Sequence, residues 1–338
     1  MRAVVLESPQ RFRVEERAEP VADDGRVLVR IESVGLCGTD VSIFSGKIPV
    51  DYPRVLGHEM VGVVESETPH LECGARVVVD PNLYCGHCYQ CSKGQTNVCV
   101  RAELMGRDRD GALQDLIEVP AANLYALPST IDPRHAALVQ VLTTCMHAQR
   151  QTPLFPEQST LVYGLGVTGL LHIQLARARG SHPLIGVTRS SVKRELAERL
   201  GADMTVDPAD PLIGEKILDV TGGRGCDVVI ECVGRVETLA RSIEVVRIGG
   251  HLTVFGTITA DRGSLPFYQL YYKEISVSNP RAAKPEDYPD CLGMIGSGRV
   301  QLEPLVTHRF PLESALEAIE ATIRPDSLKV VLDHGGSR

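Results

Sequence analysis

The sequence predicts an α/β protein with two domains, one β-rich and one built on a doubly wound parallel sheet. Residues 1 to about 140 hold short β-like runs that Gly and Pro interrupt, and helical periodicity is scarce there. From about residue 138 onward, apolar runs alternate with segments of helical periodicity. The length of 338 residues agrees with this division, since domains average about 150 residues.

Composition excludes several classes of protein. Apolar residues make up 43% and charged residues 23%, as in ordinary globular proteins. The net charge of −8 and the lack of a long basic run argue against a nucleic-acid partner. No apolar stretch reaches about 18 residues, so we expect no membrane span. The opening MRAVVLESPQ lacks the pattern of a signal peptide, so we expect a cytoplasmic protein whose ten cysteines are metal ligands or buried thiols.

In the β-rich domain, short apolar runs predict strands over Ala3–Leu6, Val27–Val34, Met60–Glu65 and Arg76–Asp80. A helix is expected over 138–150, where apolar residues recur at helical spacing. Beyond it the chain alternates between strands (160–163, 184–188, 228–231, 252–255) and helices (167–179, 192–200, 236–246). These strands are apolar without alternation, which predicts a parallel sheet covered on both faces. The pattern ends near residue 282, so we expect domains of 1–145 with 282–338, and of 146–281.

A cluster of cysteines predicts a structural zinc site within a lobe at about residues 81–100. The segment YCGHCYQCSKGQTNVC places Cys85, Cys88, Cys91 and Cys99 at the spacing C-x2-C-x2-C-x7-C. Four thiolates suit tetrahedral zinc and leave no position for a substrate. Four unrelated thiols and an iron–sulfur cluster are the alternatives.

A second, open metal site is predicted from CGTD and GHE, which contain Cys37, His58 and Glu59. A thiolate, an imidazole and a carboxylate can hold zinc and leave a place for water or substrate. Taken singly, Cys37 reads as a small buried residue and His58 as a loop histidine. Their occurrence together with the cysteine lobe favours the metal site.

A dinucleotide site is predicted from STLVYGLGVTGLLHIQLARARG, which reads as strand, Gly-rich turn and helix. Gly164, Gly166 and Gly169 form G-x-G-x-x-G, and Val167 and Thr168 begin the helix whose N-terminus receives the phosphates. This motif inside alternating strands and helices is typical of the Rossmann fold.

The end of the next strand predicts NADP(H) in preference to NAD(H). An NAD site places Asp or Glu about 20 residues after the motif, to accept a hydrogen bond from the ribose. Hydroxyl and cationic side chains stand there instead, namely Thr188, Arg189, Ser190, Lys193 and Arg194. They can bind a 2′-phosphate, and no carboxylate is there to repel it. The alternative is that they are solvated surface charges.

In combination, these motifs resemble the zinc-dependent medium-chain dehydrogenases/reductases, especially the sorbitol and threonine dehydrogenase branch. The resemblance covers essentially the whole chain, including MRAVVLESP, CGTD, GHEMVG, the cysteine lobe, GLGVTG, TGGRGCDVVIECVG and THRFPLESALEAIE. It implies a GroES-like catalytic domain, a Rossmann domain, one catalytic and one structural zinc, and hydride transfer between a nicotinamide cofactor and a secondary alcohol or ketone. It also implies a homodimer or homotetramer, with Leu252–Phe255 and Glu274–Val277 as candidate edges.

The resemblance assigns roles to further residues. Cys37, His58 and Glu59 match the catalytic zinc ligands, and Gln140 stands where the family has another ligand. Thr39 matches the hydroxyl that takes the substrate proton, whereas Ser42 replaces the family's relay histidine. Asp40 is expected to be a structural partner of its loop.

Four residues at two later strand ends match positions beside the cofactor, namely Cys232, Val233, Phe255 and Gly256. The branch favours a small polar alcohol or ketone, such as a polyol, cyclitol, sugar or amino alcohol. The alternatives are a sugar 1-dehydrogenase resembling glucose dehydrogenase and a catalytically silent, NADPH-binding member of the family.

Overall fold

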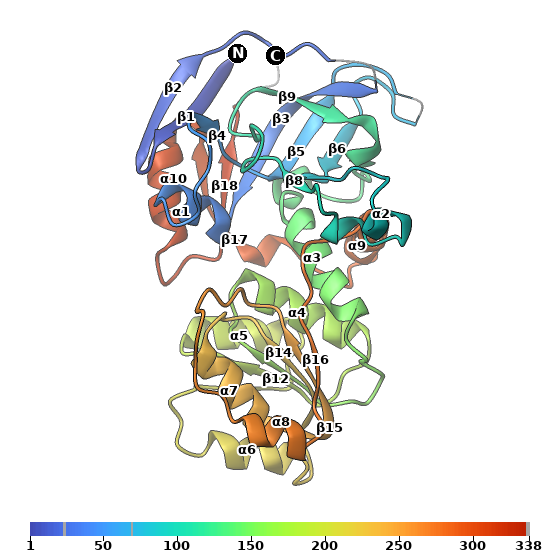
Figure 1. Ribbon diagram of the computed structural model, residues 1–338, viewed down its shortest axis with the longest axis vertical. Helices are drawn as coiled ribbons and strands as arrows, with labels where there is room; N and C mark the ends of the chain where they lie inside the picture. The colour runs from blue at the N-terminus through green and yellow to red at the C-terminus, as the bar shows by residue number, and fades with distance from the viewer. Residues whose placement is uncertain (23–24, 69, 336–338) are drawn as a thin grey trace. The chain divides into compact units, whose positions relative to one another are not determined.

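The computed structural model describes residues 1–22, 25–68 and 70–335 (Figure 1). The chain divides into two compact units. The first consists of Met1–Thr143, Lys284–Gly296 and Leu302–Arg338, and the second of Thr144–Ala283 and Ser297–Gln301. Within the described residues, no helix is both long and apolar enough to cross a membrane.

The first unit is β-rich. Its strands are β1 (Arg2–Ser8), β2 (Arg11–Glu16), β3 (Arg26–Leu36), β4 (Arg54–Val55), β5 (Glu59–Val64), β6 (Arg76–Val79), β7 (Asn82–Leu83), β8 (Glu103–Leu104), β9 (Leu116–Pro120), β10 (Leu124–Ala126), β17 (Val306–Pro311) and β18 (Lys329–Asp333). Its helices are α1 (Gly38–Phe44), α2 (Tyr89–Ser92), α9 (Asp287–Gly296) and α10 (Ala315–Thr322), and α3 (Leu138–Arg150) is shared with the second unit.

The largest sheet of this unit has the order β10-β6-β5-β3-β18-β17, with β9 also paired to β3. The C-terminal strand β18 therefore lies directly beside β3, to which it is antiparallel. Both strands bury apolar side chains, for example Val29, Val34 and Leu332, in one core. Long-range pairing between β3 and β18 thus joins the two ends of the chain in one unit.

The second unit is a six-stranded parallel sheet in the order β13-β12-β11-β14-β15-β16. Its strands are β11 (Thr160–Tyr163), β12 (Leu184–Val187), β13 (Met204–Val206), β14 (Cys226–Glu231), β15 (Val246–Val254) and β16 (Ser276–Ser278). Its helices are α4 (Val167–Ala178), α5 (Ser191–Arg199), α6 (Ile213–Val220), α7 (Val236–Val245) and α8 (Phe267–Tyr272). Helices α4 and α5 lie on one face of the sheet, and α6 and α7 on the other (Figure 1). The predicted α/β class is confirmed.

The register of this sheet aligns the strand ends that matter for a ligand. Tyr163 pairs with Val187 on one side and with Glu231 on the other, and Glu231 pairs with Val254. The residues that follow these strands therefore emerge at one edge of the sheet, where open α/β sheets bind ligands.

Several details differ from the sequence-based expectation. In the second unit the predicted elements did not include β13, α6 and α8, and the strand predicted over 252–255 begins earlier, at Val246. Strand β13 was missed because it is only three residues long and follows the charged Asp203. The segment Ser297–Gln301, assigned to the first domain, groups with the second unit. The physical reason is a reciprocal pair of hydrogen bonds, in which the backbone N–H of Gln301 donates to Gln174 Oε1 and Gln174 Nε2 donates to the Gln301 carbonyl.

Candidate active site and metal centres

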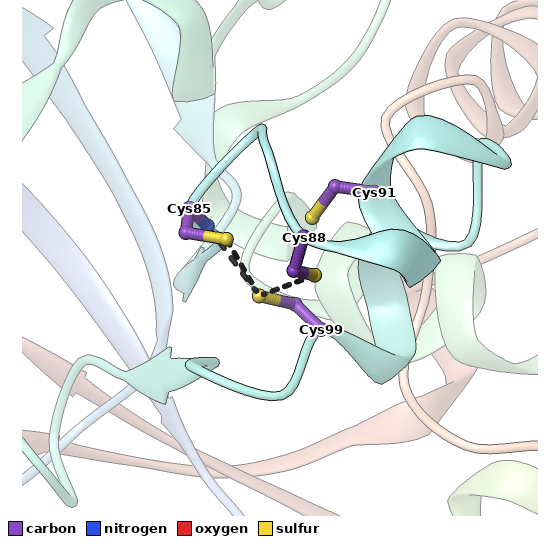
Figure 2. A group of neighbouring side chains, drawn as sticks. All are labelled: Cys85, Cys88, Cys91 and Cys99. Atoms are coloured by element: carbon purple, nitrogen blue, oxygen red, sulfur yellow. Dashed lines mark hydrogen bonds between the residues drawn. The ribbon is translucent and has the colours of Figure 1, made fainter.

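The four cysteines of the lobe come together from separate turns. Cys85 follows β7, Cys88 and Cys91 begin and end the first turn of α2, and Cys99 ends a short 3-10 helix. Figure 2 shows the four side chains converging, and their sulfur atoms all lie within 4.8 Å of one another.

The sulfur–sulfur distances decide what this cluster can hold. Cys85 Sγ and Cys99 Sγ are 3.6 Å apart, and Cys88 Sγ and Cys99 Sγ are 3.8 Å apart. A disulfide bond requires about 2.05 Å, so these are not disulfide geometries. A tetrahedral zinc ion about 2.3 Å from each sulfur sets neighbouring sulfurs about 3.8 Å apart. An iron–sulfur cluster places several iron ions between its thiolates and therefore needs a wider spacing. The donor set fits zinc.

The open site is assembled by pairing of β3 with β5. Gly35 on β3 pairs with Glu59 on β5, so Cys37, just after β3, lies near His58, just before β5. Cys37 Sγ and His58 Nε2 are 3.1 Å apart. Cys37 also caps α1, because its sulfur accepts a hydrogen bond from the backbone N–H of Thr39. A sulfur and an imidazole nitrogen facing each other are suitable zinc donors.

Asp40 orients both of these residues. Its fully buried carboxylate accepts hydrogen bonds from the backbone N–H groups of Cys37 and Gly57, and Oδ1 lies 3.5 Å from His58 Nδ1. Burial by itself would lower the pKa of His58, but the Cys37 thiolate and the Asp40 carboxylate outweigh it and raise that pKa well above its ordinary value. A carboxylate behind a ligating histidine fixes the ring and its tautomer. Asp40 thus belongs to the site as a positioning residue.

Glu59 lies elsewhere than the sequence-based assignment placed it. Its carboxylate binds the ammonium group of Lys329, at 2.8 Å through Oε1 and 2.6 Å through Oε2, and the cluster near Cys37 does not include it. The physical reason is its pairing: Glu59, the first residue of β5, lies opposite Gly35 on β3 and binds the ammonium group that Lys329 brings from β18, whereas His58 precedes the strand. The assignment of Glu59 as a direct zinc ligand therefore disagrees with the structure.

The Glu59–Lys329 pair is deeply buried and connects three strands. The two side chains are 1% and 4% exposed. Lys329 also donates to the carbonyl of Leu36, the residue before Cys37. Gly35 is required beside it, since a Cβ atom there would lie 2.2 Å from Glu59 Oε2. One ammonium group on β18 therefore fixes both segments that carry the metal donors. Sequence reasoning missed Lys329; the only local signal is a lysine at the start of the apolar run KVVLD.

The side chains of the other residues predicted at this site, Thr39, Ser42 and Gln140, form no hydrogen bond with Cys37 or His58 within the described residues. Thr39 and Ser42 are both half-buried on α1. Gln140 lies in the first turn of α3, where its carbonyl accepts a hydrogen bond from the Thr143 hydroxyl. Its assignment as a zinc ligand stays a prediction.

The Gly-rich turn has the shape of a phosphate site. Gly164 has a φ of +87°, and a Cβ on Gly169 would lie 1.8 Å from the Gly164 carbonyl oxygen. A Cβ on Gly166 would meet nothing within 4 Å, so the approach to the backbone is open there. Gly166 begins α4 without a side-chain cap. The first N–H groups of α4 are therefore free to bind an anion.

The cationic segment after β12 is only partly available to a ligand. Nη1 of Arg194 donates to the carbonyls of Thr188 and Arg189 and lies 3.2 Å from Asp207 Oδ2. Arg194 therefore holds the loop together, and Asp207 balances its charge. Ser190 caps α5 by accepting from the Lys193 backbone, and the side chain of Arg189 is exposed.

The turn after β14 packs against the Gly-rich turn, and the turn after β15 packs against the turn after β14. A Cβ on Gly164 would lie 2.7 Å from Cγ2 of Val233, which shows how closely the two turns pack. Cys232 is half-buried, and burial raises the pKa of its thiol. The backbone N–H groups of Phe255 and Gly256 both donate to the Glu231 carbonyl. A cavity of about 720 Å³ lies elsewhere, lined by residues of α6, of the C-terminal part of α7 and of the start of β15, and its lining within the described residues includes no residue of the Gly-rich turn.

Family comparisons agree with this arrangement. Residues 23–129 match the model of the alcohol dehydrogenase GroES-like domain, and residues 167–297 match that of the zinc-binding dehydrogenases. The chain is 30% identical to a sorbitol dehydrogenase from Halalkalibacterium halodurans over 95% of both chains.

Solved structures are similar over nearly the whole chain. A zinc-binding dehydrogenase from Sinorhizobium meliloti bound to NADP has a TM-score of 0.93 at 30% identity and 98% coverage of both chains. An alcohol dehydrogenase from Escherichia coli complexed with NADH has a TM-score of 0.92 at 26% identity, covering 98% of this chain and 99% of its own. The predicted combination of a GroES-like and a Rossmann domain is confirmed.

The buried ion pair yields a stability prediction. Lys329→Met removes the partner of a buried carboxylate, so we expect the free energy of unfolding to fall by about 3–5 kcal/mol in denaturant titrations. The double variant Lys329→Met/Glu59→Gln should recover most of that loss, because no buried charge is then unpaired. The control is Arg76→Met, which breaks an exposed pair with Glu32 and should cost under about 1 kcal/mol. Equal losses for the two single variants would contradict this role of Lys329.

The two donor sets yield a prediction about metal content. We expect Cys99→Ser to lose the zinc of the lobe and Cys37→Ser to lose the zinc of the open site, each keeping the other ion, as measured by elemental analysis of purified protein. Only Cys99→Ser should also lower the melting temperature strongly, because the metal orders a lobe with little core of its own. Unchanged zinc in Cys37→Ser would rule out the open site.

Proposed function

The chain belongs to the zinc-dependent medium-chain dehydrogenases/reductases, and on this basis we propose that it transfers a hydride between NADP(H) and a secondary alcohol or its ketone. It is a zinc-dependent oxidoreductase that uses a nicotinamide cofactor and a small alcohol. The observation that carries the proposal is that Cys37 Sγ faces His58 Nε2, with the Asp40 carboxylate 3.5 Å from the other ring nitrogen of His58. The same chain holds a Gly-rich turn followed by a helix, α4, that has no side-chain cap.

We propose Cys37, His58 and Gln140 as the holders of the catalytic zinc, and the four lobe cysteines as the holders of a structural zinc. The open-site metal supplies Lewis acidity at the substrate oxygen. Gln140 offers a neutral amide oxygen, a weaker donor than a carboxylate. Loss of zinc from Gln140→Ala, with the lobe zinc retained, would support this ligand, and unchanged zinc would remove it.

We assign the proton step to Thr39. Its backbone N–H donates to Cys37 Sγ at 3.2 Å, and Thr39 lies in the first turn of α1, next to this metal donor. A hydroxyl there can receive the substrate proton through a hydrogen bond. Ser42 stands where the family has a histidine, and a hydroxyl is no base near neutral pH, so the proton leaves by another route.

NADP(H) is favoured over NAD(H) by the end of β12. Thr188, Arg189, Ser190 and Lys193 offer donors to a 2′-phosphate, and the neighbouring carboxylate, Asp207, is already paired with Arg194. The Sinorhizobium meliloti relative bound to NADP is consistent with this choice, whereas the Escherichia coli relative is complexed with NADH.

We also propose a substrate class and an oligomeric state. Similarity to a sorbitol dehydrogenase favours a polyol, cyclitol, sugar or amino alcohol. For the assembly we propose a homodimer or homotetramer. Strand β16 ends the six-stranded sheet, whereas the other candidate edge, Leu252–Phe255, was wrong, because β15 pairs with a strand on each side. Val277 on β16 is 53% exposed, and Tyr271 on the preceding helix α8 is 82% exposed. An uncovered strand edge with apolar neighbours is a site for pairing with a second copy.

Turnover on a panel of polyols, cyclitols, aldoses and amino alcohols tests the function. We expect kcat/KM with NADP⁺ to exceed that with NAD⁺ by about tenfold or more, because charge-assisted hydrogen bonds contribute about 1.5–3 kcal/mol each. Thr188→Asp should shift the preference toward NAD⁺, because a carboxylate repels the 2′-phosphate and accepts from the ribose hydroxyl.

Cys37→Ser is the control for this assay. It should abolish turnover with both cofactors while leaving cofactor binding intact, because it changes only the metal site. A wild-type preference for NAD⁺ would refute the cofactor assignment. No turnover on any substrate of the panel would refute the substrate class.

The assembly is tested by Val277→Lys. A lysine at the edge strand opposes pairing with a second copy, so the mass measured by light scattering should fall to that of a smaller species. Val192→Lys, at a site 71% exposed on α5, is the matched control and should leave the mass unchanged. A monomeric wild type, or equal masses for both variants, would contradict the edge-pairing proposal.

A further inference from the structure

A fully buried carboxylate organises the turn that follows β14. Oε1 of Glu231 accepts hydrogen bonds from the backbone N–H groups of Val233 and Gly234, at 2.8 and 3.0 Å, and from the Thr238 hydroxyl at 2.7 Å. Oε2 is 3.1 Å from the Gly234 nitrogen. Glu231 is 0% exposed and forms no ion pair with any residue the structure describes. A buried anion without a cation is costly, so neutral donors must compensate it.

The carboxylate also occupies the space between two turns. A Cβ on Gly256, in the turn after β15, would lie 2.8 Å from Glu231 Oε2 and 2.2 Å from the Gly234 nitrogen. Only a glycine permits this approach. Thr238 lies in the first turn of α7, whose N-terminal partial positive charge stabilises an anion. Glu231 therefore joins the turn after β14, the turn after β15 and the start of α7.

These hydrogen bonds set the polarity of the turn. Because the N–H groups of Val233 and Gly234 point inward to Glu231, they are unavailable to a ligand. The carbonyl oxygens of Cys232 and Val233, by contrast, accept no hydrogen bond within the described part of the chain. Val233 is 42% exposed and packs on Gly164 of the phosphate turn. The outer surface of the turn thus offers hydrogen-bond acceptors next to the phosphate site.

A dinucleotide lies across the carboxyl ends of such a sheet, with each half over one set of strands. Strand β14 begins the second set, beyond the switch point beside β11, so the turn at 232–234 faces the half that carries the nicotinamide. Two groups of that half donate hydrogen bonds, the ribose hydroxyls and the carboxamide NH2. The ribose is the one joined directly to the pyrophosphate, and the turn at 232–234 packs on Gly164 of the phosphate turn.

We propose that Glu231 is a positioning residue for cofactor binding. It fixes the turn at 232–234 so that carbonyl oxygens, and not N–H groups, face the ribose hydroxyls of the nicotinamide half. The inference builds on the proposed function, because it presumes a nicotinamide dinucleotide.

The test compares the whole cofactor with its adenosine half. The chain has no tryptophan, so the fluorescence of bound NADPH reports its dissociation constant without interference. We expect Glu231→Gln to weaken NADPH binding about tenfold, because an amide nitrogen replaces one acceptor oxygen. Calorimetry should show unchanged affinity for 2′,5′-ADP, which lacks the nicotinamide half. Thr238→Val, which removes one donor, should have a smaller effect in the same direction. Glu215→Gln, at an exposed carboxylate on α6, is the matched control.

The binding experiments separate the role of Glu231 from the choice of cofactor. Equal weakening of NADPH and 2′,5′-ADP, or a lower melting temperature with unchanged NADPH affinity, would reduce Glu231 to a structural residue and overturn the inference. If Glu231→Gln does not fold, Thr238→Val decides alone by the same comparison. If the wild type binds NADH and not NADPH, only the cofactor assignment fails, and NADH with ADP replaces the pair. If it binds neither cofactor, the proposed function itself fails.

Discussion

The candidate catalytic centre depends on one buried ammonium group. Lys329 on the C-terminal strand bonds the Glu59 carboxylate and the Leu36 carbonyl, and these belong to the two strands whose ends carry Cys37 and His58. Leu36, before Cys37, and Leu56 and Met60, around His58, anchor both donor segments in the main core. Their spacing is set by strand pairing and by this ion pair. Strand β18 supplies both the pairing with β3 and the ammonium group of Lys329, and it thereby joins the C-terminal segment to the first unit.

In the second unit, a buried anion fixes the backbone near the proposed cofactor site. There a carboxylate, Glu231, gathers N–H and hydroxyl donors, and glycines allow the turns to pack around it. In both units a buried charged side chain, Lys329 or Glu231, fixes the backbone. The residues that would touch a ligand are positioned by hydrogen bonds with side chains that do not themselves touch it. Asp40 acts in this way on His58, and Arg194 on the loop after β12.

The sequence predicted those parts of the molecule whose physical cause is local. The strand over Thr160–Tyr163 was predicted with its exact bounds, because its apolar run ends at a Gly-rich turn. The four lobe cysteines were found because their spacing alone defines a zinc site. The pairing of Glu59 could not be found in this way, since its partner is 270 residues distant. Its adjacency to His58 suggested a shared ligand set, whereas the ammonium group of Lys329, from a strand near the C-terminus, binds its carboxylate. Strand β13 is short and borders charged residues, and so has no apolar signature.

The separation of Glu59 from the donor cluster has a chemical consequence for the open site. Four thiolates more than neutralise a zinc ion, so the lobe suits a structural role and offers no Lewis acid. One thiolate and one imidazole leave the ion with positive charge, and a neutral Gln140 as the proposed further ligand would not remove it. A carboxylate at the metal would. The carboxylate of Glu59 is bound by Lys329, and that of Asp40, 3.5 Å from His58 Nδ1, accepts hydrogen bonds from the backbone N–H groups of Cys37 and Gly57. The ion pair would therefore do more than support the fold: it engages one carboxylate, Glu59, that could otherwise reduce the positive charge of a zinc ion bound at the open site, and that charge is what polarises an alcohol or a carbonyl.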